Sequence, residues 1–320
     1  MIQPNKSKKN KITIKSPGKI NLHLAIGEKR GDGFHELDSI FAALDFADSL
    51  TISALPENGA QTRLVTRKEG PFLELSQKGQ HFPPLPTEKN MVYLASELFR
   101  SKTGIKTNLS IELINRIPPG SGLGGGSSNA AATLIALNEL FCGSGGKFSG
   151  EDLLDMAANL GSDVPFFVEI ALQNPATSPA RLVGGRGEIL RFAEPPPDLA
   201  VVLAFPGFAS NTGDAYALLD KHRPTINEKK YFSSKDFSWG PPEEWKFFND
   251  FQELFLNHGT EREKDAYQTI LDGLKKAGAA FAGLSGSGSC CFGIFNEPKP
   301  AAPMQNSKVL VFHSTFFLRN

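Results

Sequence analysis

The chain has 320 residues, of which 40% are hydrophobic and 21% charged, and its 34 basic and 34 acidic side chains give a formal net charge of +0. This composition is that of a globular chain with one large domain or two of ordinary size, and it excludes general disorder and fibrous repeats. The balanced charge gives no overall positive potential that would attract nucleic acid. No apolar run approaches the roughly 20 residues that span a bilayer. The polar, lysine-rich residues 1–11 come first and predict a frayed tail rather than a nucleic-acid arm.

The first half of the chain predicts strands, a glycine-rich loop and helices. Alternating apolar and polar side chains predict strands, and apolar side chains at helical spacing predict helices. The chain first predicts a strand over 12–15 that breaks at 16–18, a strand over 20–26, a hairpin turn at 30–33, and strands over 39–46 and 48–55. Hairpins or loops are predicted over 57–86. They are followed by a helix over 91–103, a strand over 109–114, and helices over 130–140 and 151–160, the last capped by Gly161.

A change of composition at 173–180 predicts a domain junction, with one domain over 1–173 and a second over 174–320. The second half predicts a glycine turn at 184–187, a strand over 199–205, a helix from Thr212, a polar segment over 221–244, a helix over 261–277, and strands over 279–284, 290–295 and 309–312. Early strands followed by mixed helices and strands favour an α+β architecture over a regularly alternating doubly wound sheet. Three cysteines without repeated spacing argue against disulfides or zinc and predict a cytoplasmic location.

A glycine-rich loop precedes the 130–140 helix and predicts a phosphate site. Its residues are Pro118, Pro119, Gly120, Ser121, Gly122, Leu123, Gly124, Gly125, Gly126, Ser127 and Ser128. Glycines let the backbone approach a phosphate closely, and the start of a helix offers unsatisfied N–H groups and the positive end of its dipole. The two serines cap the helix or offer hydroxyls to a phosphate or cation.

The favoured interpretation is a loop that wraps the phosphates of ATP in a small-molecule kinase, and two other interpretations compete with it. A flexible linker is one, although linkers rarely end in an apolar helix. Dinucleotide binding is the other, because Gly120-x-Gly122-x-x-Gly125 matches the nicotinamide fingerprint, but the neighbouring elements do not alternate as strand, helix and strand. The ordinary P-loop pattern fails, since no Gly-Lys pair is followed by Ser or Thr.

A kinase also needs positive charge on the transferred phosphoryl group and a base for the acceptor hydroxyl. Lys19 follows a Pro-Gly break at the mouth of a strand, and Asp163 precedes an apolar run that would partly desolvate its carboxylate. Taken singly, each is also compatible with an ordinary surface or capping residue. Composition alone goes no further than a phosphate site with two candidate partners.

Four segments together resemble the GHMP kinase superfamily. They are Ser16-Pro17-Gly18-Lys19-Ile20-Asn21-Leu22, Arg30-Gly31-Asp32-Gly33-Phe34-His35-Glu36-Leu37, the loop over 118–131, and residues 160–167. A fifth segment, residues 283–290, resembles the third motif of the superfamily, with Gly286 and Gly288 against the phosphate loop. The resemblance implies a two-domain fold, with an N-terminal ribosomal S5 domain 2-like nucleotide-binding half and a ferredoxin-like C-terminal half.

The resemblance also implies roles for individual residues. Asp163 accepts the proton of the acceptor alcohol, Lys19 supplies the cation, and Asn21 lines the acceptor site. Asn90 lies on the adenine side of the nucleotide. Phe34 and Tyr216 sandwich the base of a small cytidylyl substrate, His35 reads its polar edge and Thr212 faces the substrate. Position 34 is usually Tyr in such kinases and is Phe here, which keeps the stacking face and loses a hydroxyl.

The expected cofactors are ATP and Mg²⁺, with no protein ligand of the metal assigned, because water and ATP oxygens supply most of the coordination. The expected partners are ATP and the cytidylyl substrate, without nucleic acid or membrane, and the sequence leaves monomer and homodimer open. Within the superfamily, kinases of homoserine or mevalonate stay open as alternatives. A nucleotide-binding module without turnover is the alternative from another class.

Overall fold

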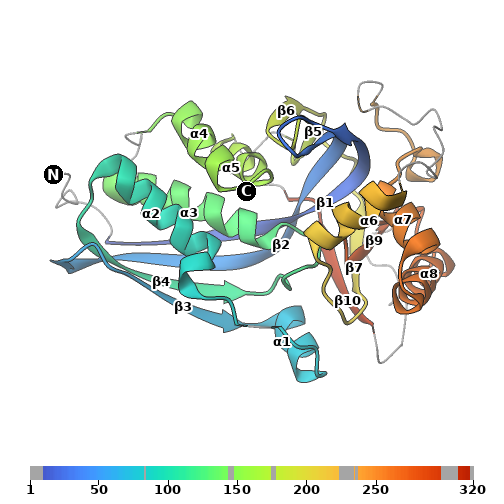
Figure 1. Cartoon of the computed structure of the whole chain (residues 1–320), viewed down its shortest axis with the longest axis horizontal. Coiled ribbons are helices and arrows are strands. Elements are labelled where there is room, and N and C mark those ends of the chain that lie inside the picture. Colours follow the sequence, from blue (N-terminus) through green and yellow to red (C-terminus); the bar gives the residue numbers. More distant parts are fainter. Residues whose placement is uncertain are drawn as a thin grey trace. The chain divides into compact units, whose positions relative to one another are not determined.

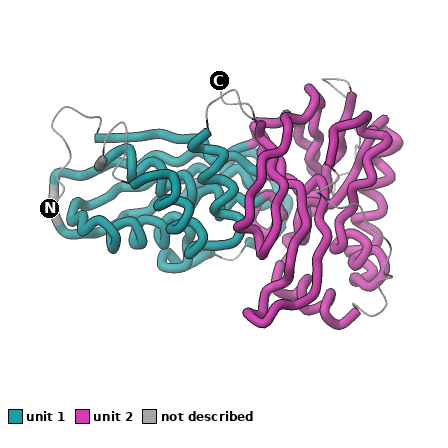
Figure 2. Tube along the Cα trace, turned by 90° about the horizontal axis from the view of Figure 1, so that it is seen from above, with its two compact units in different colours: residues 1–18, 47–117, 124–174 teal, residues 19–46, 118–123, 175–320 magenta. Residues whose placement is uncertain are grey.

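The computed structural model describes residues 10–82, 84–142, 148–173, 178–222, 234, 237–296 and 309–317. The chain divides into two compact units, coloured separately in Figure 2. Unit 1 comprises residues 1–18, 47–117 and 124–174, and unit 2 comprises residues 19–46, 118–123 and 175–320. Residues 174–177 lie outside the described residues, so the predicted domain junction at 173/174 stays a prediction.

The strands of unit 1 form a mixed sheet. Strands β1 (Lys11–Lys29) and β2 (His35–Asn58) contribute residues to both units, and β1 pairs with β2. In unit 1, the second half of β2 is antiparallel to β4 (Thr107–Asn115), and β4 is parallel to β3 (Thr62–Lys68). Every second side chain of β4 is buried, which is the period that a strand with one covered face requires.

The helices of unit 1 are α1 (Gly70–Gln77), the 3₁₀ turn η1 (Thr87–Lys89), α2 (Met91–Thr103), α3 (Gly125–Cys142), α4 (Gly150–Leu160) and α5 (Val164–Leu172). Helices α2 to α5 pack on one another and lie on the same side of the strands (Figure 1). Asn90 caps the start of α2, and Gly104 ends it with a φ of 71°. The Ser149–Asp152 capping box begins α4 in the same way.

Unit 2 contains strand pairs and a second sheet. The first half of β2 is antiparallel to β5 (Ala180–Gly184), which is antiparallel to β6 (Ile189–Phe192). The second sheet has the order β10-β7-β9-β8, with every neighbour antiparallel. Its strands are β7 (Ala200–Phe205), β8 (Phe281–Leu284), β9 (Cys291–Phe295) and β10 (Leu310–Thr315).

The helices of unit 2 are α6 (Thr212–His222), the 3₁₀ turn η4 (Pro242–Glu244), α7 (Asp250–His258) and α8 (Glu261–Lys276). Helices α7 and α8 pack on β8 and on each other, and α8 also contacts β9 (Figure 1). The core between them holds Val202, Phe251, Leu254 and Ile270. Both units therefore combine helices with a sheet, which confirms the predicted mixed α and β class.

The structure differs from the sequence prediction at several places, and no element was predicted for α5, α7, β5 or β6. Strand β1 continues through Ser16-Pro17-Gly18, where a break was predicted, and the two strands predicted over 39–46 and 48–55 are one strand, β2. The stretch 57–86 contains β3 and α1 in addition to loops. Helix α3 begins at Gly125, five residues before the predicted start, so the last four loop residues are its first turn.

Within the part of the chain that the structure describes, no helix combines the length and the apolar character needed to cross a membrane.

Candidate active site

The glycine loop (residues 118–128) leaves β4 and enters α3. Gly120, Gly122 and Gly124 have φ values of 66°, 76° and 70°, in the left-handed region that favours glycine. Gly125, Gly126, Ser127 and Ser128 form the first turn of α3, and the N–H of Ser128 donates to the carbonyl of Gly124 at 2.9 Å. The first turn of a helix leaves backbone N–H groups without intrahelical acceptors, and these groups attract anions.

Within unit 2, the third-motif turn (residues 283–290) holds the first part of the loop. The hydroxyl of Ser285 donates to the carbonyl of Gly122 at 3.0 Å, and the N–H groups of Ser289 and Cys290 donate to the carbonyls of Gly120 and Ser121, each at 3.0 Å. A Cβ atom at Gly122 would lie 2.0 Å from the carbonyl oxygen of Ser285. The two segments are therefore so close that only glycine fits at position 122.

Gly286 and Gly288 have different neighbours within this turn. A Cβ atom at Gly286 would lie 3.3 Å from the carbonyl oxygen of Gly122 and 3.4 Å from Oδ1 of Asn21. At Gly288 the nearest atom is the hydroxyl of Tyr267, at 2.7 Å. Gly286 thus lies against the glycine loop. Gly288 lies between that loop and α8, since its carbonyl oxygen would be 2.9 Å from a Cβ atom at Gly122.

Lys19 and Asn21 lie side by side on β1 and are 3% and 2% exposed. The Nζ atom of Lys19 donates to Oδ1 of Asn21 at 2.5 Å and lies 4.6 Å from the centroid of the Phe41 ring. Nδ2 of Asn21 donates to the hydroxyl of Ser39 at 3.1 Å. The N–H of Lys19 also donates to the carbonyl of Leu123 in the glycine loop, at 2.9 Å. The ammonium group is therefore fixed in position beside the loop, within unit 2.

Asp163 and Asn90 belong to unit 1. Asp163 is half-buried at the N-cap position of α5, where the helix dipole favours a negative charge, and the hydroxyl of Ser162 lies 3.5 Å from its Oδ1. Asn90 accepts the N–H of Val92 at 3.0 Å and so caps α2. A Cβ atom at Gly126, in the first turn of α3, would lie 3.5 Å from Cγ of the adjacent Met91. The pairing of Asp163 with Lys19 stays a prediction.

The residues predicted to hold the base lie in unit 2. Phe34 follows the β1–β2 turn, where Asp32 accepts its N–H at 3.1 Å, and its ring is 47% exposed. The guanidinium carbon of Arg186 lies 5.0 Å from the centroid of that ring. Thr212 begins α6, and its hydroxyl lies 3.0 Å from that of Ser287 in the third-motif turn.

His35 is buried and stacks on Tyr216, with ring centroids 5.1 Å apart and planes 18° apart. Its Nε2 lies 3.1 Å from the carboxylate of Asp220, and its Nδ1 lies 3.1 Å from the carbonyl of Gly27. Both ring nitrogens therefore already face oxygen acceptors.

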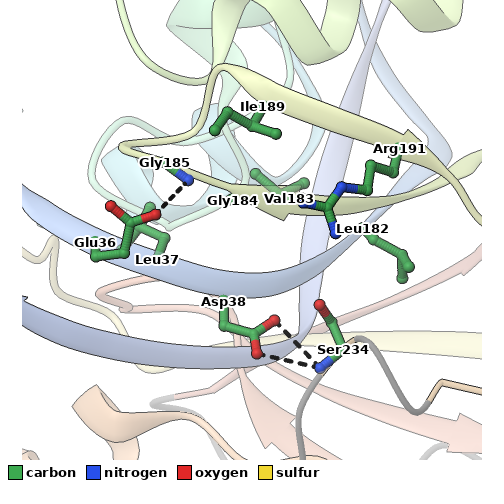
Figure 3. A pocket seen from close by; sticks show the side chains of 10 residues that line it. All are labelled: Glu36, Leu37, Asp38, Leu182, Val183, Gly184, Gly185, Ile189, Arg191 and Ser234. Carbon is green, nitrogen blue, oxygen red and sulfur yellow. Dashed lines mark hydrogen bonds between the residues drawn. The ribbon is translucent and has the colours of Figure 1, made fainter.

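A cavity of about 280 Å³ lies elsewhere in unit 2, beside β2, β5 and β6 (Figure 3). Two of its polar side chains, Glu36 and Asp38, are already engaged. Glu36 accepts the N–H of Gly185 at 2.9 Å and the guanidinium of Arg30 at 3.0 Å, and Asp38 accepts the N–H of Ser234 at 3.2 Å. None of the residues predicted for the active site lines it.

The family comparison matches both halves of the chain. Residues 90–169 match the GHMP kinases N terminal domain, and residues 243–307 match the GHMP kinases C terminal domain. The chain is also 30% identical over 314 residues to the 4-diphosphocytidyl-2-C-methyl-D-erythritol kinase of Thermodesulfovibrio yellowstonii, covering 96% of each sequence. The chain belongs to the GHMP kinase family.

Two further relatives of this GHMP kinase carry the same description. The 4-diphosphocytidyl-2-C-methyl-D-erythritol kinase of Thermotoga maritima is 34% identical over 295 residues, covering 88% of this chain and 90% of that one. A crystal structure of a 4-(cytidine 5'-diphospho)-2C-methyl-D-erythritol kinase superposes with a TM-score of 0.68 and 25% identity, covering 95% of this chain and 98% of the other. The fold is thus the two-domain GHMP kinase fold, as predicted, and the nucleotide of this family is ATP.

Sequence reasoning missed several residues that support the predicted site. Ser285 holds Gly122, and Asp220 holds His35. Ser285 had a weak signal, because it lies within a motif that was recognised for its glycines. Asp220 had none, since its partner lies in a different element 185 positions away along the chain.

Proposed function

We propose that this GHMP kinase transfers the γ-phosphoryl group of ATP to the 2-hydroxyl of 4-diphosphocytidyl-2-C-methyl-D-erythritol, a step of the non-mevalonate route to isoprenoids. The observation that carries the proposal is the similarity to a kinase of that substrate over 96% of both chains. The glycine loop, the third-motif turn and buried Lys19 supply the chemistry that such a transfer needs.

In this proposal the glycine loop binds the triphosphate. The first-turn N–H groups of α3 (Gly125–Cys142) and the backbone of Gly120 to Gly124 donate to the phosphate oxygens. Asn90 lies on the adenine side. The geometry that supports this role is the run of left-handed glycines, which exposes backbone donors without side chains in the way.

The transfer step uses Asp163 and Lys19. The acceptor hydroxyl gives its proton to the carboxylate of Asp163, its oxygen forms a bond to the γ-phosphorus, and the bond to the β–γ bridging oxygen breaks to release ADP. The ammonium of Lys19 stabilises the negative charge at the reaction centre and keeps Asp163 ionised. Asn21, which accepts a hydrogen bond from Lys19 at 2.5 Å, orients that ammonium and lines the acceptor site.

The cytosine lies between Phe34 and Tyr216, with Thr212 facing the substrate and His35 at the polar edge of the base. Phe34 supports this role because it is 47% exposed at a turn, so that its ring is accessible for a base to stack on. Stacking supplies affinity for any base, and hydrogen bonds to the edge supply the discrimination.

Mg²⁺ is the metal that this chemistry implies, and it would neutralise charge on the ATP phosphates. Among the described residues there is no cluster of three or more His, Cys, Asp or Glu that could hold a metal ion. Mg²⁺ in kinases is usually bound mainly by phosphate oxygens and water. The hydroxyl of Ser127, in the first turn of α3, is the protein oxygen proposed to face it, because the buried hydroxyl of Ser128 accepts that of Ser16 at 2.8 Å.

An ADP-release assay across candidate alcohols tests the substrate. We expect turnover with the cytidylyl substrate and none with homoserine or mevalonate, and the reverse result would reject the assignment. Asp163→Asn should lower kcat by about 10² or more, because a carboxamide cannot take the proton. A kcat near that of the wild type would remove Asp163 from the mechanism. Tight ATP binding without turnover of any alcohol would instead indicate a non-catalytic module.

A further inference from the structure

Asp48 is a buried carboxylate that the proposed mechanism does not use. It lies in β2 and is 1% exposed. A buried charge is costly unless it is paired or fully hydrogen-bonded, so its partners show what it does.

Those partners lie on both sides of the glycine loop. Oδ1 of Asp48 accepts the N–H of Arg116 at 2.6 Å and the N–H of Ile117 at 2.8 Å. Its Oδ2 accepts Nδ2 of Asn129 at 2.8 Å. Arg116 and Ile117 are the last residues before Pro118, and Asn129 is the first residue after Ser128. One carboxylate thus joins the chain just before the loop to the chain just after it.

The surroundings of this carboxylate leave little room for adjustment. A Cβ atom at Gly125 would lie 2.9 Å from Cγ2 of Ile117, so the two ends of the loop are in close contact. Burial raises the pKa of Asp48, and the hydrogen bonds from Ile117, Asn129 and Arg116 act against that rise. Without Asp48, the N–H groups of Arg116 and Ile117 would lose their acceptor, and Ile117 is only 4% exposed.

We propose that Asp48 is a positioning residue, which holds both ends of the glycine loop so that its backbone N–H groups meet the phosphates of ATP in one fixed arrangement. The inference rests on the proposed function, because the ligand of the loop is assigned there. Donors that are already in place cost no reorganisation when charge develops on a phosphate. A loop with free ends has to be ordered at the moment of binding, which weakens affinity.

The two possible roles of Asp48 predict different effects when it is replaced. If its role is only structural, its loss lowers the stability of the protein and leaves the KM values of the folded fraction unchanged. If it is a positioning residue, its loss raises the KM for ATP, whether or not kcat also falls, and leaves the KM for the alcohol substrate as it was. The two are separated by steady-state kinetics on folded protein, with circular dichroism to measure the folded fraction.

Four variants give the test. Asp48→Ala removes the acceptor. Asn129→Asp places a second carboxylate beside that of Asp48 and removes the donor. The double variant Asp48→Asn/Asn129→Asp restores an amide donor opposite a carboxylate acceptor, and the amide oxygen at position 48 still accepts the two backbone N–H groups. Asp45→Asn is the matched control, since Asp45 lies in the same strand but accepts Ser314 Oγ at 2.6 Å and the N–H of Thr315 at 3.0 Å, away from the loop.

We expect the KM for ATP to rise roughly tenfold or more in Asp48→Ala and in Asn129→Asp, as for the loss of a buried hydrogen-bonding partner. The double variant should recover most of that loss, and Asp45→Asn should match the wild type. Wild-type KM for ATP in folded Asp48→Ala would overturn the inference. If Asp48→Ala does not fold, the comparison of Asn129→Asp with the double variant decides. A double variant whose KM for ATP is no lower than that of Asn129→Asp alone overturns the inference. Wild-type protein that neither binds nor hydrolyses ATP would reject the proposed function itself.

Discussion

Lys19 combines a positive charge with almost complete burial, at 3% exposure. Removing an ammonium group from water costs several kcal/mol unless other groups replace the lost hydration. Here the amide oxygen of Asn21 and the ring face of Phe41 provide part of that replacement. The side chain is held in place before any substrate arrives, which is the condition under which a fixed charge stabilises a transition state.

We therefore expect Lys19→Ala to lower kcat by about 10² or more, a typical effect of removing one electrostatic contact to the transition state. The matched control is Lys15→Ala, because Lys15 is an exposed lysine in the same strand. Steady-state measurement of ADP release gives kcat for both variants. A Lys19→Ala enzyme as fast as Lys15→Ala would show that this ammonium does not act on the phosphoryl group.

Asp220 is the residue that orients His35. Its two carboxylate oxygens face Nε2 of His35 and Nζ of Lys29, each at 3.1 Å. Because His35 in turn stacks on Tyr216, the orientation of both rings depends on a carboxylate that sequence reasoning left unnoticed.

Asp220→Asn should raise the KM for the cytidylyl substrate roughly threefold to tenfold and change kcat less. A charge-assisted hydrogen bond supports the upper figure, and the partial exposure of Asp220, at 33%, supports the lower. Asp214→Asn is the control, since Asp214 is an exposed acid of the same helix. Equal KM values for the two variants would mean that the orientation of His35 does not affect substrate binding.

Among the elements, the glycine loop tolerates the least change. Gly122→Ala introduces a Cβ atom 2.0 Å from a carbonyl oxygen of the third-motif turn, at a residue with a φ of 76°. Both the glycine loop and the third-motif turn are backbone at this contact, so one of them has to shift to make room. We therefore expect the KM for ATP to rise at least tenfold, as for other misplaced positioning groups. Gly240→Ala is the control, because nothing lies within 4 Å of the added atom there. A normal KM for ATP in Gly122→Ala would show that the loop does not need its present path.

The elements were predictable where local signals agree. Helix α2 (Met91–Thr103) has the predicted bounds, because an apolar face, the Asn90 cap and the left-handed Gly104 all mark the same segment. The predicted break at Ser16-Pro17-Gly18 was wrong, because Ser16 and Gly18 are buried in a strand that continues through the proline. Helix α3 begins five residues before its predicted start, because the prediction followed the poor helix propensity of glycine and serine and the structure does not.

For the whole molecule, the sequence predicted the fold class correctly and led to the segments proposed for the site, but it did not predict the residues that hold these segments in place. Lys19 and the loop glycines lie in recognisable motifs. Asp48 contacts residues 68, 69 and 81 positions away, and such contacts have no local signature. A lone aspartate in an apolar strand is equally consistent with an exposed edge. Only the three-dimensional pairing separates the two.

The free energy of unfolding of the whole molecule should decrease as the pH is lowered through the range between the unfolded and folded pKa values of His23. His23 is fully buried in β1, and burial lowers its pKa from 6.5 to about 4, with the nearby Asp38 carboxylate acting in the opposite direction. Between these two values the unfolded chain binds a proton that the folded protein does not. The free energy of unfolding therefore decreases as pH is lowered from 6.5 towards 4, by roughly 3 kcal/mol from this residue.

Urea unfolding at pH 7 and at pH 4.5, followed by circular dichroism, measures this decrease. His23→Asn should lower stability at both pH values, because it leaves a cavity, but it should lose most of the roughly 3 kcal/mol dependence. His313→Asn changes an exposed histidine and should keep the wild-type dependence. Asp48 acts in the opposite direction, since burial raises its pKa, so only the difference between wild type and variant isolates His23. An unchanged dependence in His23→Asn would assign the acid sensitivity to other groups.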